Sequence, residues 1–206
     1  MKHKRLVLAG SKVAFALLGL SSIIIEIVTL VERGTFNPAN FFSFFTVLSN
    51  LFAAMMLIMG AVFIYKGRAS RRLDMLRGAA TLYMVMTGVV FAVLLSNLDP
   101  RLLTAVPWDN TVLHYIMPIV LLIDWIVDPP ASAIGLGRSI IWLAFPLIYV
   151  MYSLVRGAMV GWYPYPFLNP QDGGYGSVLL TSFFIMLFTV SAGILLTRLG
   201  NYRSKA

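Results

Sequence analysis

Two side chains that could act together as a nucleophile and a base lie inside long apolar stretches of the sequence. Thr46 follows the aromatic run 41–45, and His114 is one of only two histidines, the other being His3. A neutral imidazole accepts protons as a general base, and a hydroxyl group beside such a base becomes a nucleophile. The pair therefore predicts covalent chemistry without a thiol, in a chain that has no cysteine.

The composition indicates whether the protein that carries this pair is soluble or lies in a membrane. The 206 residues are 59% hydrophobic and only 12% charged, whereas a soluble domain carries about 25% charged residues. A chain with so few charges cannot cover the surface of a soluble fold with polar side chains, which excludes a soluble enzyme, a disordered protein and a coiled coil. We therefore expect an integral membrane protein.

Six segments provide the helices that must position the two side chains. Each approaches or exceeds the length of about 20 mostly apolar residues that a transmembrane helix needs, and none alternates with the period of two that is typical of β-barrel strands. The expected fold is all-α, a single polytopic domain over residues 1–206 with six transmembrane helices. The predicted spans are residues 13–31, 42–65, 78–98, 110–127, 139–155 and 176–197.

The basic residues predict how these helices are oriented. Of the 16 Lys and Arg residues, 13 flank the spans on the side of both termini, and only Arg33, Arg101 and Arg156 lie on the other side. The positive-inside rule then places both termini in the cytoplasm, with the inner membrane of a bacterium as the expected location. Orientation also accounts for the net charge of +8 without a nucleic-acid partner. No small-residue cleavage site follows the first apolar run cleanly, so we expect that run to remain as an anchor.

This topology brings polar side chains of several spans to one depth. Thr46 and His114 lie near the start of spans that begin on the outer side, and Glu26 lies near the outer end of the first span. Polar groups within a membrane are energetically costly, and by default they mark functional sites. The residues expected to support this site or to line its pocket are Asn50, Glu26, Ser43, Asp124, Arg156, Tyr152, Trp162 and Tyr165.

Helical spacing indicates roles for some of these residues. Asn50 lies one turn after the nucleophile and is expected to donate a hydrogen bond to the developing oxyanion. Pro118 removes the backbone donor that the carbonyl of His114 would otherwise accept. Glu26 and Asn50 are the candidates to orient the histidine ring, while Asp124 lies deeper and favours a hydrogen bond that locks two helices together.

Each of these residues also has a structural interpretation. A threonine in a transmembrane helix more often bonds the carbonyl four residues before it, and a lone buried histidine is often a packing residue. Glu26 could pair with Arg156 or with His114. The loop Trp162–Phe167 is typical of an aromatic belt at a membrane surface, and it would also suit a stiff cap over an apolar mouth for an acyl chain.

Three landmarks stand out together: Phe44–Asn50, His114–Pro118 with Asp124-Trp125 after it, and Trp162–Phe167. In these landmarks and their order the chain resembles, over most of its length, bacterial members of the FAR-17a / androgen-induced-gene-like family of six-helix membrane proteins. Animal members of that family are intramembrane threonine hydrolases, which cleave esters of fatty acids with hydroxy fatty acids. The resemblance implies that Thr46 is the nucleophile and His114 the base.

The sequence thus predicts a hydrolase for a membrane lipid or lipid-like ester that uses neither a metal nor a cofactor, and it indicates no oligomeric state. The alternative is a small transporter or proton-coupled carrier with an intramembrane relay of Glu26, His114, Asp124 and Arg156. A scaffold role is the third interpretation. Retinal, haem and zinc proteins are disfavoured, because the lysines lie at or outside the span ends and only one histidine lies within a span.

Overall fold

The computed structural model of the chain describes residues 2–98 and 104–204. All regular secondary structure in these two ranges is helical, and six of the helices are long and apolar enough to cross a membrane. The expected all-α fold with six helices of this kind is therefore confirmed, and it is compatible with a multi-pass membrane protein. Arg101 and Lys205, which the positive-inside count includes, lie outside the described residues.

Three of the six spans are single helices, and three are built from shorter helical segments in line. The single helices are α1 (Lys2–Glu32), α3 (Phe45–Tyr65) and α10 (Pro170–Arg203), the last of which is kinked near its start at Gly174. The composite spans are α4 (Arg71–Val90) with η1 (Phe91–Leu95), α6 (Pro107–Thr111) with η2 (Val112–Ile116) and α7 (Met117–Val127), and α8 (Leu136–Ser139) with η3 (Ile140–Leu143) and α9 (Ala144–Val160). The two remaining short helices are α2 (Pro38–Phe41) and η4 (Pro166–Leu168).

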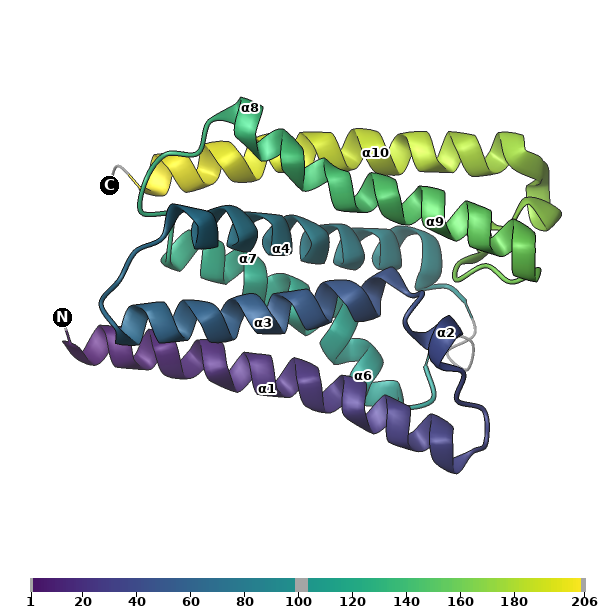
Figure 1. Cartoon of the computed structure of the whole chain (residues 1–206), viewed down its shortest axis with the longest axis horizontal. Helices are drawn as coiled ribbons and strands as arrows, with labels where there is room; N and C mark the ends of the chain where they lie inside the picture. Colours follow the sequence, from purple (N-terminus) through teal and green to yellow (C-terminus); the bar gives the residue numbers. More distant parts are fainter. Residues whose placement is uncertain (1, 99–103, 205–206) are drawn as a thin grey trace.

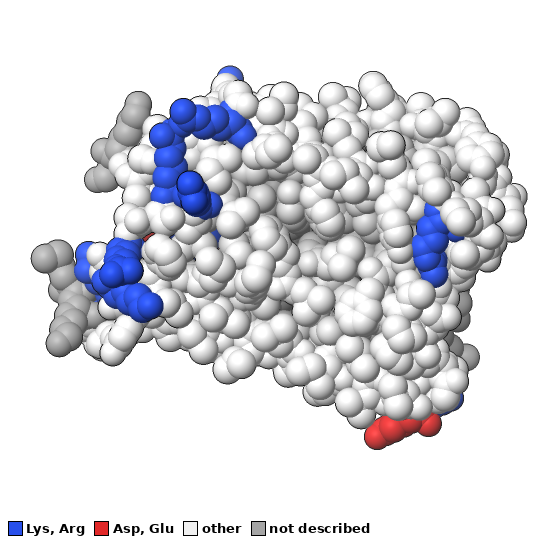
Figure 2. Space-filling model, viewed as in Figure 1, with Lys and Arg blue, Asp and Glu red and all other residues white. Residues whose placement is uncertain are grey.

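Helix α4 lies at the centre of the bundle, where it contacts α3, α7 and α10 (Figure 1). Helix α1 packs along α3 on one side, and α8 and η3, which lead into α9, contact α10 on the other. Both ends of the chain lie at the same end of the bundle, while α2 lies toward the opposite end. On the face shown in Figure 2, Lys and Arg gather mainly at the end that carries the termini, and the broad middle band carries no charge. Such a band suits contact with lipid.

A network of five charged side chains lies inside the bundle near the termini. Lys12 of α1 forms an ion pair with Asp124 of α7, and its Nζ lies 2.9 Å from Asp128 Oδ2. Arg77 of α4 reaches Asp124 at 3.1 Å, Asp128 at 2.8 Å and Asp74 at 3.3 Å. The Lys12 side chain is only 1% exposed. The network therefore fastens three helices together through groups that cannot be separated without leaving a buried charge.

This network corrects three sequence-based interpretations. Lys12 and Arg77 were expected to lie at or outside the span ends, but both are buried within helices. Asp124 locks helices together as expected, but through ion pairs with both cations and away from the site that it was expected to support. The physical reason is that Lys12 has a long, flexible stem, which passes Gly60 of α3. A Cβ atom at Gly60 would lie 3.3 Å from Lys12 Cδ, so the missing side chain gives the stem its path.

Trp125 explains why a tryptophan follows Asp124. Its indole N–H donates to the carbonyl of Leu196 at 3.0 Å, and its ring packs against Gly200 of α10. A Cβ atom at Gly200 would lie 2.8 Å from the ring, and close approach of this kind is what small residues allow between membrane helices. Asp124 and Trp125 together hold α7 to α1, α4 and α10.

Asp124→Asn is expected to lower the free energy of unfolding in detergent micelles by about 3–5 kcal/mol, because it breaks the buried ion pairs that Asp124 forms with both Lys12 and Arg77. The control is Lys66→Met, which removes an exposed lysine outside the network. The control should change the unfolding free energy by less than about 0.5 kcal/mol. Equal stability of the two variants would show that the network does not hold the bundle together.

Candidate active site

The segment that carries His114 changes its hydrogen-bond spacing just before a proline. Residues Val112–Ile116 form a π-helical turn, in which the N–H of Met117 donates to the carbonyl of Val112, five residues earlier. In this register the carbonyl of Leu113 would need the N–H of residue 118, which is a proline and has none. The carbonyl of Leu113 is therefore left without this donor.

Asn50 of α3 fills this gap. Its side-chain Nδ2 donates to the Leu113 carbonyl at 3.2 Å and to the Thr46 carbonyl at 2.9 Å. Both amide hydrogens are thereby committed to the backbone, so Asn50 is not the oxyanion donor that the sequence predicts. It acts instead as a clamp that holds the first turns of α3 against the π-helical turn.

The clamp brings the two predicted catalytic side chains together. Thr46 Oγ1 lies 3.1 Å from His114 Nε2, and both residues are buried. The other ring nitrogen, Nδ1, lies 3.1 Å from the carbonyl oxygen of Asn110. A carbonyl only accepts hydrogen bonds, so Nδ1 carries the hydrogen and the lone pair of Nε2 faces the threonine hydroxyl. Thr46 therefore donates to a histidine that is set up to accept its proton.

The backbone carbonyl of Asn110 replaces the carboxylate that the sequence analysis sought as the orienting group. Neither Glu26 nor Asn50 contacts the His114 ring among the described residues. The ring plane is held by Phe91 of η1, whose ring stacks on it at a centroid distance of 4.0 Å and an angle of 25°. Both rings lie in π-helical turns, a feature that is frequent at functional sites.

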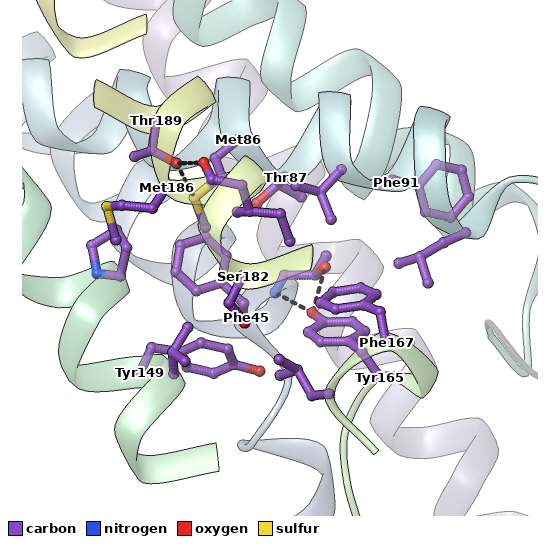
Figure 3. Close-up of a pocket in the computed structure, with 17 residues that line it drawn as sticks. Phe45, Met86, Thr87, Phe91, Tyr149, Tyr165, Phe167, Ser182, Met186 and Thr189 are labelled. Atoms are coloured by element: carbon purple, nitrogen blue, oxygen red, sulfur yellow. Dashed lines mark hydrogen bonds between the residues drawn. The ribbon is translucent and has the colours of Figure 1, made fainter. Parts of the chain in front are cut away.

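Tyr165, from the loop between α9 and α10, covers the start of α3. Its hydroxyl oxygen accepts the Thr46 backbone N–H at 3.3 Å and lies 3.4 Å from Thr46 Oγ1. The ring stacks on Phe167 at 5.1 Å, as Figure 3 shows. Burial raises the pKa of Tyr165, so the phenol stays neutral and keeps a hydrogen to donate.

Four other predicted residues build the wall behind this site. The hydroxyl groups of Ser43 and Tyr152 lie 2.9 Å apart. Arg156 donates to Asn40 Oδ1 at 2.7 Å and lies over the ring of Trp162 at 5.1 Å. These contacts tie α2 and the aromatic loop to α9. Arg156 does not pair with Glu26 among the described residues, contrary to one of the interpretations above.

The pair Thr46–His114 lies on the wall of a cavity of about 320 Å³, which also reaches Glu26 and Tyr165. This volume lies within the range of about 300–1,000 Å³ that small-molecule sites occupy. A second, narrower slot of about 60 Å³ shares Thr46 and Tyr165 with the cavity and runs between α4, α9 and α10 (Figure 3). Apolar residues that line the slot include Met86, Val90, Val150, Phe167, Ile185 and Met186.

The other members of the predicted relay do not join the pair. Glu26 Oε1 accepts the Ala105 N–H at 2.8 Å, so this carboxyl group is held on the far part of the cavity wall. Asp124 lies in the ion network and lines none of the cavities around Thr46. Within residues 2–98 and 104–204, no three His, Cys, Asp or Glu side chains are grouped so that they could hold a metal ion.

No protein-family model, curated protein or solved structure matches this chain. The assignment of the site therefore rests on its own geometry. That geometry combines a hydroxyl hydrogen-bonded to a neutral imidazole, a phenol above the same hydroxyl, and two cavities that meet there.

Asn50→Leu is expected to lower the free energy of unfolding by about 1–3 kcal/mol, because it leaves the buried carbonyl of Leu113 without its side-chain donor. Asn97→Leu is the matched control, since it makes the same change at an exposed position after η1. Chemical unfolding of the two purified variants in micelles measures the free energy of unfolding of each. A fully stable Asn50→Leu protein would contradict the role of Asn50 as a clamp.

Proposed function

We propose that this protein is an intramembrane lipid-ester hydrolase, with Thr46 as the nucleophile and His114 as the general base. The observation that carries the proposal is the 3.1 Å hydrogen bond from Thr46 Oγ1 to His114 Nε2 on a cavity wall. The resemblance to the FAR-17a / androgen-induced-gene-like family supports it, because the animal hydrolases of that family use the same two residue types. We propose that the chain belongs with them.

The proposal includes an orientation, with both termini in the cytoplasm and the site in the outer half of a bacterial inner membrane. It is supported by the gathering of Lys and Arg at the end of the bundle that carries the termini (Figure 2). A lipid would then reach Thr46 by lateral diffusion just below the outer headgroups. Water would enter the cavity from the same side.

In the first half of the reaction, Thr46 Oγ attacks the carbonyl carbon of the ester while its proton passes to His114 Nε2. The tetrahedral intermediate collapses, the bond to the alkoxy oxygen breaks, and the leaving alcohol takes the proton from His114. The product of this half is an acyl ester on Thr46. The hydrogen bond from Nδ1 to the Asn110 carbonyl steadies the imidazolium that forms for a moment between the two proton transfers.

Negative charge on the tetrahedral oxygen is stabilised by groups at the start of α3. Thr46 is the second residue of this 21-residue helix, and the first backbone N–H groups of a helix have no acceptor within the helix. The Thr46 N–H already donates to the Tyr165 hydroxyl oxygen, so the phenol hydrogen is left to point toward the ester. Tyr165 thus takes the oxyanion role that the sequence predicted for Asn50.

In the second half, water attacks the acyl carbon, gives a proton to His114, and the bond to Thr46 Oγ breaks as the oxygen recovers that proton. The carboxylic acid then leaves the cavity. The acyl chain occupies the slot between α4, α9 and α10, where the flexible side chains of Met86 and Met186 adapt to it. The substrate class is a long-chain ester, of which esters of hydroxy fatty acids are the members that the resemblance implies.

Thr46→Ala and His114→Ala are each expected to lower kcat/KM for a long-chain ester by about 10³-fold or more, because each removes one half of the activated nucleophile. Hydrolysis is measured with purified protein in bicelles. Ser191→Ala, which removes a hydroxyl bonded only to its own helix on α10, is the control and should keep wild-type activity. Full activity in either Thr46→Ala or His114→Ala would remove the proposal, as would ion or solute flux into proteoliposomes without hydrolysis.

Tyr165→Phe is expected to lower kcat by about 10²-fold with little change in KM, because the phenol hydrogen is used most strongly in the transition state. The comparison is Tyr175→Phe, at an exposed position near the start of α10. If Tyr165→Phe changes only KM, the residue shapes the cavity but does not stabilise the oxyanion.

A further inference from the structure

Two carboxyl groups that the hydrolytic mechanism does not use lie on the wall of the same cavity. Glu26 comes from α1 and Asp109 from α6, and both line the cavity together with Thr46 and His114. The hydroxyl oxygen of Thr104 lies between the two carboxyl groups. Its Oγ1 lies 2.9 Å from Glu26 Oε2 and 2.5 Å from Asp109 Oδ1. We call Glu26, Thr104 and Asp109 the acidic bridge.

The acidic bridge leaves buried acceptors without donors. Asp109 is 1% exposed, and its second oxygen, Oδ2, accepts no hydrogen bond from the described residues. The side-chain oxygen of the next residue, Asn110, also lines the cavity without a donor. A buried acceptor without a partner costs about 1–3 kcal/mol, and such groups in folded proteins are usually completed by a ligand or an ordered water. The wall is therefore built to receive hydrogen-bond donors.

The charge of the wall points to the same kind of ligand. Among the described residues that line the cavity there are two acidic side chains and no Lys or Arg. Arg33 donates to the Ala105 carbonyl at 3.1 Å, but it is exposed and lies outside the lining of the cavity. A carboxylate or phosphate in the cavity would meet like charge and acceptor oxygens, and the described residues that line the cavity offer no Lys or Arg to balance it.

We propose that the acidic bridge is a headgroup subsite, which selects esters whose polar end carries hydrogen-bond donors, either hydroxyl or ammonium groups, and rejects esters that end in a carboxylate. This inference rests on the proposed function and names the substrate class within it. The scissile carbonyl lies at Thr46, the acyl chain enters the apolar slot, and the donor group of the leaving alcohol binds Asp109 and Glu26.

The subsite predicts a different substrate from the one that the family resemblance implies. Esters of fatty acids with hydroxy fatty acids carry a free carboxylate on the alcohol part, which is the part that would face the acidic bridge. The same molecule with its carboxylate reduced to an alcohol presents a donor at that position instead. The two compounds share the scissile ester and both chains, so the ratio of their kcat/KM values isolates the contribution of the headgroup.

The test measures hydrolysis of four matched oleoyl esters by the wild-type protein in bicelles. They differ only in the far end of the alcohol chain, which is a carboxylate, a primary alcohol, a primary amine or a methyl ether. We expect kcat/KM for the alcohol or the amine to exceed that for the carboxylate and the methyl ether by about tenfold or more. The alcohol and amine arms show which of the two donors the subsite prefers.

Variants then assign the selectivity to the acidic bridge. Asp109→Asn and Glu26→Gln are expected to reduce the ratio of alcohol to carboxylate to within about threefold, because each replaces a carboxyl oxygen with an amide NH₂ group, which donates instead of accepting. Asp172→Asn removes an exposed carboxylate at the start of α10 and should keep the wild-type ratio. A wild-type ratio near one, a preference for the carboxylate, or full selectivity in both bridge variants would overturn the inference.

A binding measurement separates the subsite from the hydrolase. Affinities of wild-type protein for 1-O-hexadecylglycerol, hexadecylamine and palmitate, none of which contains an ester, are measured in the same bicelles. If the two donors bind more tightly than palmitate but no ester is hydrolysed, the subsite stands and the hydrolase proposal fails. If esters are hydrolysed through Thr46 but the three ligands bind equally, the hydrolase stands and the subsite is wrong.

Discussion

The site depends on one constraint, which is that Pro118 has no backbone N–H to donate. The buried Leu113 carbonyl has no proline N–H to accept from its own helix, so its donor comes from another helix. Asn50 supplies that donor at 3.2 Å and holds the Thr46 carbonyl with its other hydrogen. The same amide therefore fixes the start of α3 to the π-helical turn, and this attachment sets the 3.1 Å contact between Thr46 and His114.

The bundle divides its polar groups between two ends with different tasks. Near the termini, the network around Arg77 and Asp124 joins three helices through ion pairs between buried side chains, which suits a structural role. At the other end, the polar groups around Thr46 line cavities, and some of their acceptors have no partner among the described residues. Rigid pairing at one end and unsatisfied groups at the other are what a membrane enzyme needs, because the site must be held firmly and still have groups free for a ligand.

The sequence was sufficient to predict the six helices, and the depth of Thr46 and His114 was sufficient to pair them, because both follow from hydropathy and helical spacing. The ion network was missed because a lysine near the end of an apolar run is usually a topology signal, and no pattern shows that Lys12 reaches Asp124, 112 residues away. Tyr165 was predicted only as part of the pocket wall, since aromatic residues in such a loop are common at membrane surfaces. Asp109 was overlooked because it lies just before the predicted start of a span, where a charged side chain costs little free energy.

The central claim is that the acyl group of an ester passes through Thr46 with His114 as the base, and an acyl adduct tests it most directly. Purified protein is mixed with an activated oleoyl ester, quenched in acid within the first turnover, digested and mapped by mass spectrometry. The account predicts an oleoyl group on the peptide that contains Thr46, with its amount reduced to background in His114→Ala. An adduct on a different residue, or steady hydrolysis with no adduct at Thr46, would contradict it.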